Sequence, residues 1–275
     1  MIKKYLIWMA TIITIGILVA ILGYMLVNGL KFVVEDEDGI INFLFQAPKK
    51  AGKEGGISTI IANTIFMIVL TLIFCVPIGL GASIYISEYA GQRRSVTAIK
   101  FSIDTLAGIP SIIFGLFGFI FFSNYLKLGV GLLSGSLTLS IMVLPTIIKT
   151  SVEAINAVPM SYREGSLALG ATKWDTVKRV VLPSALPGIL AGVVLAIGRI
   201  IGETAALTFT MGTDYRLADS LSSSARVLST HLYLLTKEGI SFERAFATAN
   251  VLIIIILIIN MASNRLIKRR TIVDE

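Results

Sequence analysis

The sequence predicts an all-α, polytopic membrane protein with six transmembrane helices. Hydrophobic residues make up 55% of its 275 residues, and the mean hydropathy is +0.84. Several apolar runs exceed the roughly 18 residues that a helix needs to cross a bilayer. The basic residues gather at the ends of these runs. The net charge of +7 therefore belongs to the membrane borders and does not indicate a nucleic-acid-binding surface.

The six spans are expected, in chain order, at about 6–30, 57–85, 99–122, 132–148, 186–210 and 245–262. The first apolar run is longer than the roughly 7–15 residues of a signal-peptide core, so we expect it to stay in the protein as a span. Behind it, the short apolar run 40–45 is expected to form an interfacial helix. Cys75 is the single cysteine, which excludes a disulfide within the chain, and we expect it in the core.

Three units are expected along the chain. Residues 1–56 hold the first transmembrane helix and an external loop, residues 57–265 form the core transmembrane domain, and residues 266–275 form a cytoplasmic tail. Basic residues are more frequent at the termini and in the loops on the same side than in the three opposite loops. The positive-inside rule therefore places both termini in the cytoplasm.

The connection between the fourth and fifth spans, 153–185, is the most informative stretch. Its polar part, 161–183, carries both charges and apolar residues such as Leu167 and Trp174, a mixture typical of short amphipathic helices. Connections this long are usually functional or disordered. We interpret the stretch as a docking element for a soluble cytoplasmic partner, with Pro183 and Pro187 as a hinge to the fifth span.

The motifs of several enzyme classes are missing from the sequence. The only glycine-lysine stretch, AGKEGG at residue 51, lacks the spacing and the hydroxyl residue of a phosphate-binding loop. No His/Cys cluster has metal-ligand spacing, and His231, the single histidine, is expected to be a solvated loop residue. We therefore expect no enzyme activity in this chain, so that any energy for active transport would come from another subunit.

Apart from Lys100 at the very start of the third span, three charged residues fall inside predicted spans: Asp104, Arg199 and Glu203. Each costs about 2.5–3.5 kcal/mol at the centre of a membrane helix, so each should face protein or water. Arg199 and Glu203 are four residues apart and can touch on one helix face. They either line a solute path, where the Arg199 guanidinium suits an oxyanion, or form a structural pair. Asp104 either has a role in transport or lies only near the cytoplasmic end of the third span.

Helix breakers and small residues mark the third and fifth spans. Pro110 follows Gly108 and can break the helix, so that a new half-helix begins near Ser111 with a positive dipole end that suits an anion. A simple packing kink is the alternative. The fifth span carries two rows of small residues at four-residue spacing, which permit close helix contacts: Gly188, Gly192 and Ala196, and then Gly198, Gly202 and Ala206.

A twenty-residue pattern in the docking stretch resembles the EAA loop of binding-protein-dependent ABC importer permeases. The pattern reads Glu164-Gly-Ser-x3-Gly170, nine residues, and then Val180-x-Leu182-Pro183, with Gly165 and Ser166 in place of the two alanines. The resemblance implies a coupling helix that sits in a groove of a cytoplasmic ATPase. The residues it assigns to this contact are Glu164, Gly165, Ser166, Gly170, Ala171, Trp174, Leu182 and Pro183.

Further stretches resemble the permeases of phosphate importers, A-type subunit. They are VPIGLGASIYISEYA, GIPSIIFGLFG and GRIIGETAAL, beginning at residues 76, 108 and 198. The resemblance implies the type I ABC importer permease architecture and a multi-pass subunit of the bacterial or archaeal cytoplasmic membrane. It assigns the translocation path to Arg199, Glu203, Thr204, Asp104, Pro110 and Ser111.

The resemblance also implies the partners of the chain. These are a second homologous permease that completes a heterodimer, two ATP-binding subunits that hold ATP and Mg²⁺, and an external phosphate-binding protein; the chain itself would hold no cofactor. A secondary transporter or channel for a small anion, working without an ATPase, is the alternative, but it leaves the docking stretch unexplained. The chemistry of one arginine does not distinguish phosphate from other oxyanions.

Overall fold

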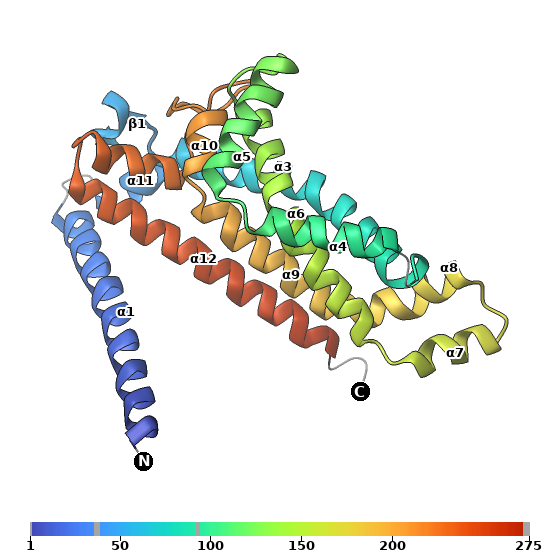
Figure 1. Cartoon of the computed structure of the whole chain (residues 1–275). Helices are drawn as coiled ribbons and strands as arrows, with labels where there is room; N and C mark the ends of the chain where they lie inside the picture. Colours follow the sequence, from blue (N-terminus) through green and yellow to red (C-terminus); the bar gives the residue numbers. More distant parts are fainter. Residues whose placement is uncertain (1, 36–38, 92–93, 272–275) are drawn as a thin grey trace.

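The computed structural model describes residues 2–35, 39–91 and 94–271 (Figure 1). Twelve α-helices lie within these ranges: α1 (Ile2–Glu35), α2 (Gly39–Phe45), α3 (Ser58–Ile84), α4 (Arg94–Ala107), α5 (Ser111–Gly118), α6 (Leu132–Ala157), α7 (Met160–Ala168), α8 (Lys173–Thr176), α9 (Leu182–Gly202), α10 (Ala205–Thr210), α11 (Leu228–Lys237) and α12 (Phe242–Thr271). Three π-helical turns extend or join them: η2 (Tyr85–Tyr89), η3 (Phe119–Tyr125) and η4 (Val177–Val181). The strands β1 (Pro48–Lys49) and β2 (Glu54–Gly55) pair antiparallel around the 3₁₀ turn η1 (Lys50–Gly52).

The predicted helical membrane fold is confirmed. Within the described ranges, five helices are long and apolar enough to cross a membrane, and there are six spans if the bent pair Val96–Ala107 and Ser111–Tyr125 is counted as one. The expected short helix at 40–45 is present as α2. The division into units at residues 56 and 265 remains a prediction, and the acidic run 35–38 and the tail 266–275 lie partly outside the described residues.

The core lies between α3, α6 and α9, which pack together in the middle of the bundle (Figure 1). Apolar side chains such as Met67, Leu139 and Ile200 are fully buried there, and Cys75 is buried among them as expected. Gly192 of α9 shows how close the helices approach, because a Cβ on it would overlap the Thr150 side chain of α6. The row Gly188, Gly192 and Ala196 therefore packs as the sequence predicts.

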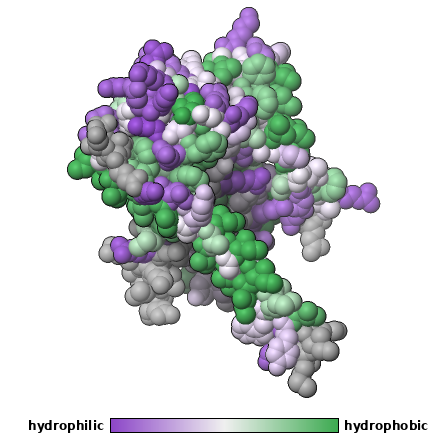
Figure 2. Space-filling model, turned by 90° about the vertical axis from the view of Figure 1, so that its left-hand side faces the viewer, coloured by the Kyte–Doolittle hydropathy of each residue, from purple (hydrophilic) through white to green (hydrophobic). Residues whose placement is uncertain are grey.

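The first helix is attached to the bundle near one end only. The ring of Tyr24 packs edge-on against Phe246 of α12, and Asn250 Nδ2 donates to the Leu26 carbonyl at 3.1 Å. The preceding turns of α1 extend away from the bundle (Figure 1), and Figure 2 shows apolar side chains along the extended helix. An apolar surface of this kind requires lipid or another membrane helix around it.

The third span is broken, as its proline predicts. The segments Val96–Ala107 and Ser111–Tyr125 meet at 99°. Pro110, with φ −59° and ψ 141°, stands at the N-terminus of α5 and ends the preceding helical geometry. The short helix α5 packs on α10, so closely that a Cβ on Gly115 would lie 2.7 Å from the Ala206 Cα.

The fifth span differs from the prediction at both ends. Neither Pro183 nor Pro187 interrupts it, because one helical stretch runs from Lys173 to Gly202 over 30 residues. The π-helical turn η4 precedes Pro183, and its wider hydrogen-bond spacing accommodates the missing N–H. The helix is therefore continuous through both prolines, and a hinge at them remains a prediction. The span ends at Gly202 and not at residue 210, because Glu203 is extended and α10 starts a new helix.

Candidate functional site: the coupling segment and the broken spans

Residues 160–181, called the coupling segment below, form a helical hairpin that projects from the bundle (Figure 1). Gly170 reverses the chain between α7 and α8 with a φ of +87°, a conformation that favours glycine. Thr172 caps α8, since its Oγ1 accepts the Asp175 backbone N–H at 3.1 Å. Ser166 and Thr176 join the two arms through their hydroxyls, which lie 2.9 Å apart.

The coupling segment presents apolar side chains to its surroundings. Leu169 is 90% exposed and Trp174 is 54% exposed, whereas Val177 and Val181 on the other side of the segment are buried. Exposed apolar groups of this kind mark protein interaction sites when they are contiguous. The remaining residues predicted to contact an ATPase are exposed or half-buried: Glu164, Gly165, Ser166, Gly170, Ala171, Leu182 and Pro183.

Arg163 fastens the coupling segment to the bundle, a role that the sequence analysis missed. Its Nε and Nη2 donate to Glu88 Oε1 at 3.0 and 2.8 Å. Its guanidinium also donates to the carbonyls of Val158 at 2.6 Å and Ile155 at 2.9 Å. The side chains of Arg163 and Glu88 are only 12% and 8% exposed. Glu88 lies 75 residues away in the chain, so no local spacing could have indicated the pair.

Arg199 and Glu203 do not form the pair that their spacing permits. The helix ends between them at Gly202, and Glu203 turns its carboxylate toward α10, where Oε1 accepts the Ala206 backbone N–H at 3.1 Å. Arg199 stays half-buried, and no described residue forms an ion pair or hydrogen bond with its guanidinium. The arrangement gives Glu203 a local structural contact and leaves Arg199 available for another group.

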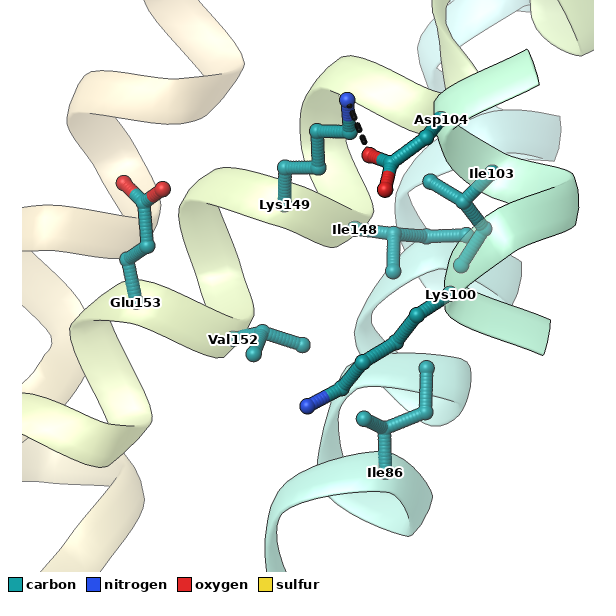
Figure 3. A pocket seen from close by; sticks show the side chains of 8 residues that line it. All are labelled: Ile86, Lys100, Ile103, Asp104, Ile148, Lys149, Val152 and Glu153. Atoms are coloured by element: carbon teal, nitrogen blue, oxygen red, sulfur yellow. Dashed lines mark ion pairs between the residues drawn. The ribbon is translucent and has the colours of Figure 1, made fainter. Parts of the chain in front are cut away.

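Asp104 pairs with α6 and not with the fifth span. Its Oδ1 lies 2.6 Å from Lys149 Nζ, at the rim of a pocket of about 350 Å³ between α4 and α6 (Figure 3). The same pocket is lined by Lys100 and Glu153, so it holds two cationic and two anionic side chains. Because the two cationic and two anionic side chains balance, the pocket favours neither an anion nor a cation. Its charged groups form a polar contact between α4 and α6.

The remaining predicted path residues lie at the two breaks. Pro110 and Ser111 start α5, and Thr204 starts α10; these two short helices pack against one another. On α9, the glycines of the second small-residue row, Gly198 and Gly202, have open space around them. The fifth span is therefore crowded by this chain on one side only. The transport roles of Pro110, Ser111 and Thr204 remain predictions.

At the opposite end of the bundle, the loop 213–228 is fastened by buried polar groups. Arg226 donates to the Thr213 carbonyl at 2.9 Å and to the Ala51 carbonyl at 3.0 Å. His231, expected to be solvated, is only 1% exposed and lies against Gly52 of the β-hairpin. Burial and the nearby Arg226 and Arg244 lower the pKa of His231 from 6.5 to about 3. The prediction failed because an isolated histidine carries no periodic pattern that would indicate burial.

Known proteins with similar sequences are membrane subunits of transporters. The family described as "Binding-protein-dependent transport system inner membrane component" matches residues 76–272. The "Probable ABC transporter permease protein YqgI" of Bacillus subtilis is 32% identical over 267 residues, which cover 90% of each chain. The "Phosphate transport system permease protein PstA 1" of Mycobacterium tuberculosis is 33% identical over 212 residues, covering 76% of this chain and 69% of that protein.

A solved structure shares the fold. A chain of the bacterial alginate ABC transporter, solved in complex with alginate pentasaccharide-bound periplasmic protein, superposes with a TM-score of 0.69 at 19% identity. The superposition covers 98% of this chain and 96% of that one. The family match spans more than half of the chain and includes both the coupling segment and the broken fifth span. The chain therefore belongs to the inner membrane components of binding-protein-dependent transport systems, the permease subunits of ABC importers.

Proposed function

We propose that this permease imports inorganic phosphate, as one half of a heterodimeric translocation path. The observation that carries the proposal is the 33% identity to a phosphate transport system permease over 212 residues. The half-buried Arg199 adds a chemical reason, because a guanidinium without a partner among the described residues can bind an oxyanion through two parallel N–H donors. The second half of the path is a homologous permease, which would cover the open row at Gly198 and Gly202.

The energy comes from two ATP-binding subunits that dock on the coupling segment. Support comes from the exposed apolar residues Leu169 and Trp174 and from the EAA-like pattern that surrounds them. ATP and Mg²⁺ are held by those subunits and not by this chain. In this arrangement both termini and the coupling segment face the cytoplasm, and the loop 213–228 faces an external phosphate-binding protein.

Phosphate uptake in cells that depend on this transporter tests the assignment. Arg199→Ala should reduce uptake at least about tenfold, because a lost charge-assisted contact in a low-dielectric path costs about 1.5–3 kcal/mol. Arg265→Ala is the matched control, since Arg265 is an exposed arginine of α12 that lies outside both the predicted path and the coupling segment. Both variants must be present in the membrane at the parental level.

Two results would contradict the proposal. Unchanged phosphate uptake in the Arg199→Ala strain would remove the arginine from the path. Uptake of sulfate in preference to phosphate by the parental transporter would replace the cargo while leaving the ABC permease assignment intact. The alginate transporter shows that the fold itself does not fix the cargo.

A further inference from the structure

The helices α3 and α6 are hydrogen-bonded to the same segments at both ends of the bundle. At one end, both connect to the loop 213–228; at the other end, both connect to the coupling segment through Arg163. Together with η2, α3 forms one helical stretch of 32 residues, about 48 Å long at 1.5 Å per residue. A single packed pair of helices therefore touches both surfaces at which soluble partners of an importer would dock.

Asn63 makes the central contact at the loop end. It is fully buried; its Nδ2 donates to the Arg216 carbonyl at 2.9 Å, and its Oδ1 accepts the Ala218 backbone N–H at 3.0 Å. Neighbouring hydroxyls of α3 add two contacts: Thr59 Oγ1 donates to the Tyr215 carbonyl at 2.6 Å, and Thr64 Oγ1 accepts the Leu228 N–H at 3.0 Å. The Asn63 amide thus satisfies a backbone carbonyl and a backbone N–H of the loop. These bonds fix the loop in one position relative to α3.

The N-terminus of α6 holds the same loop through backbone hydrogen bonds. The Leu132 and Leu133 N–H groups donate to the carbonyls of Ser223 and Leu221 at 3.0 and 2.8 Å. These are orphan donors of the first turn of a helix, which the loop satisfies. The loop thus closes over the ends of α3 and α6 together.

Close packing and hydrogen bonds join the two helices along their length. Ser140 Oγ donates to the Thr71 carbonyl at 3.1 Å, and Ser83 Oγ donates to the Ile148 carbonyl at 3.2 Å. Between these bonds, Gly79 lies so close to Ile147 that a Cβ would meet its side chain at 2.7 Å. Packed helices of this kind move as one body, because interiors with few voids transmit displacement.

At the coupling end, one arginine holds both helices. Arg163 reaches Glu88 at the end of the α3 stretch and the Ile155 carbonyl near the end of α6. A second contact supports it: Lys173 of α8 lies 4.9 Å from the ring centre of Tyr89. Both arms of the coupling segment are therefore fixed to η2.

We propose that the α3–α6 pair carries the signal between the loop 213–228 and the coupling segment, with Asn63 and Glu88 as the positioning residues at its two ends. The proposal rests on the proposed function, in which the loop meets an external binding protein and the coupling segment meets an ATPase. Docking on the loop displaces the helix pair, and Arg163 passes the displacement to the coupling segment.

The fifth span is the competing route, since α8, η4 and α9 are continuous with the coupling segment. Its far end is weaker as a transmitter. The span breaks at Glu203, and its contact with α11 there is the hydrogen bond from Ser229 Oγ to the Glu203 carbonyl at 2.6 Å. Ser229→Ala removes this hydrogen bond of the fifth span. It is therefore the variant to compare with Asn63→Ala.

The test measures ATP hydrolysis by the purified, reconstituted complex with and without the external phosphate-binding protein loaded with phosphate. Asn63→Ala and Glu88→Gln are each expected to lower the ratio of stimulated to basal hydrolysis at least about fivefold, the lower range of allosteric coupling. Basal hydrolysis should not change in Asn63→Ala, because Asn63 lies at the opposite end of the bundle from the coupling segment; Glu88→Gln is judged on the ratio alone, because Glu88 holds Arg163 of that segment. The double variant should have the same ratio of stimulated to basal hydrolysis as the more impaired single variant, because either change interrupts the same connection.

Several outcomes would overturn the inference. These are an unchanged ratio in both single variants, additive losses in the double variant, or a loss in Ser229→Ala with none in Asn63→Ala. Glu88→Gln preserves the side-chain shape and keeps the test decisive if Asn63→Ala does not assemble. Asn250→Ala, at a buried asparagine that contacts α1, should leave the ratio unchanged. Absence of stimulation in the parental complex would instead count against phosphate import itself.

Discussion

The loop 213–228 and the coupling segment lie at opposite ends of α3 and α6, and they differ in what their side chains touch. The loop is held by buried polar groups, including Asn63 and Arg226, which are 0% and 6% exposed. The coupling segment is held by Arg163 on one side and presents Leu169 and Trp174 on the other. The polar groups of one end are thus satisfied within the chain, whereas the other end exposes an apolar surface of the kind that marks interaction sites.

The difference separates two kinds of mutational effect. Substitutions in the exposed part of the coupling segment should weaken partner binding and leave the stability of the isolated subunit unchanged. Substitutions among the buried polar groups of the loop end should lower stability first.

Gly170→Val should have the largest effect, on assembly. Valine disfavours the positive φ of +87° at this turn, so the two arms of the coupling segment would separate or reorient. We expect co-purification of the ATPase from detergent-solubilised membranes to fall at least about tenfold, which corresponds to about 1.4 kcal/mol or more. Gly239→Val is the matched control, because Gly239 also has a positive φ, +63°, and open space around it, but lies between α11 and α12, outside the coupling segment. Full ATPase recovery with Gly170→Val would refute the docking role of the segment.

Arg226→Ala should lower stability at the loop end. The substitution removes the hydrogen bonds of the buried Arg226 guanidinium to the carbonyls of Thr213 and Ala51, and hydrogen bonds to a charged group contribute about 1.5–3 kcal/mol. Thermal unfolding of the purified subunit should therefore shift to lower temperature. Arg216→Ala is the control, since the Arg216 side chain is 82% exposed in its pair with Asp214 and should shift the transition much less. Equal shifts for both arginines would contradict the comparison of the two ends.

His231 should make the loop end sensitive to acid. Its pKa is lowered from 6.5 to about 3 in the folded state, so the unfolded state binds the proton first as the pH falls. The contribution of His231 to the free energy of unfolding is therefore fully present above about pH 6.5. It decreases below that pH, by about 2 kcal/mol at pH 5. The unfolding temperature should fall between pH 7.5 and pH 5 in the parental protein, and this difference should shrink in His231→Gln. An equal difference in both proteins would exclude His231 as the cause.

Leu169→Ser should have the smallest effect on the subunit itself. The side chain is 90% exposed, so the free energy of unfolding should change by no more than about 0.5 kcal/mol, as for ordinary surface substitutions. The unfolding temperature should therefore hardly change. Binding of the ATPase, measured by titration of the reconstituted permease, should weaken severalfold because an apolar contact is lost. Unchanged binding would place Leu169 outside the docking surface.

The sequence was sufficient where the pattern is local. Apolar runs predicted the spans, and Pro110 marked the place where the third span breaks. It was insufficient where contacts join distant residues. Arg163 and Glu88 are 75 residues apart, and their pairing follows from the packing of α3 on α6. The end of the fifth span at Gly202 was also missed, because the apolar pattern continues beyond it into α10.

Purification of the chain from its native membrane, followed by measurement of ATP hydrolysis in the co-purified material, tests whether it is the phosphate permease of an ATP-driven importer. We expect a second permease and an ATPase to accompany the chain. Hydrolysis should rise when phosphate-loaded binding protein is added but not when phosphate-free binding protein is added. A chain that is recovered alone, or hydrolysis that responds to both forms equally, would contradict this assignment.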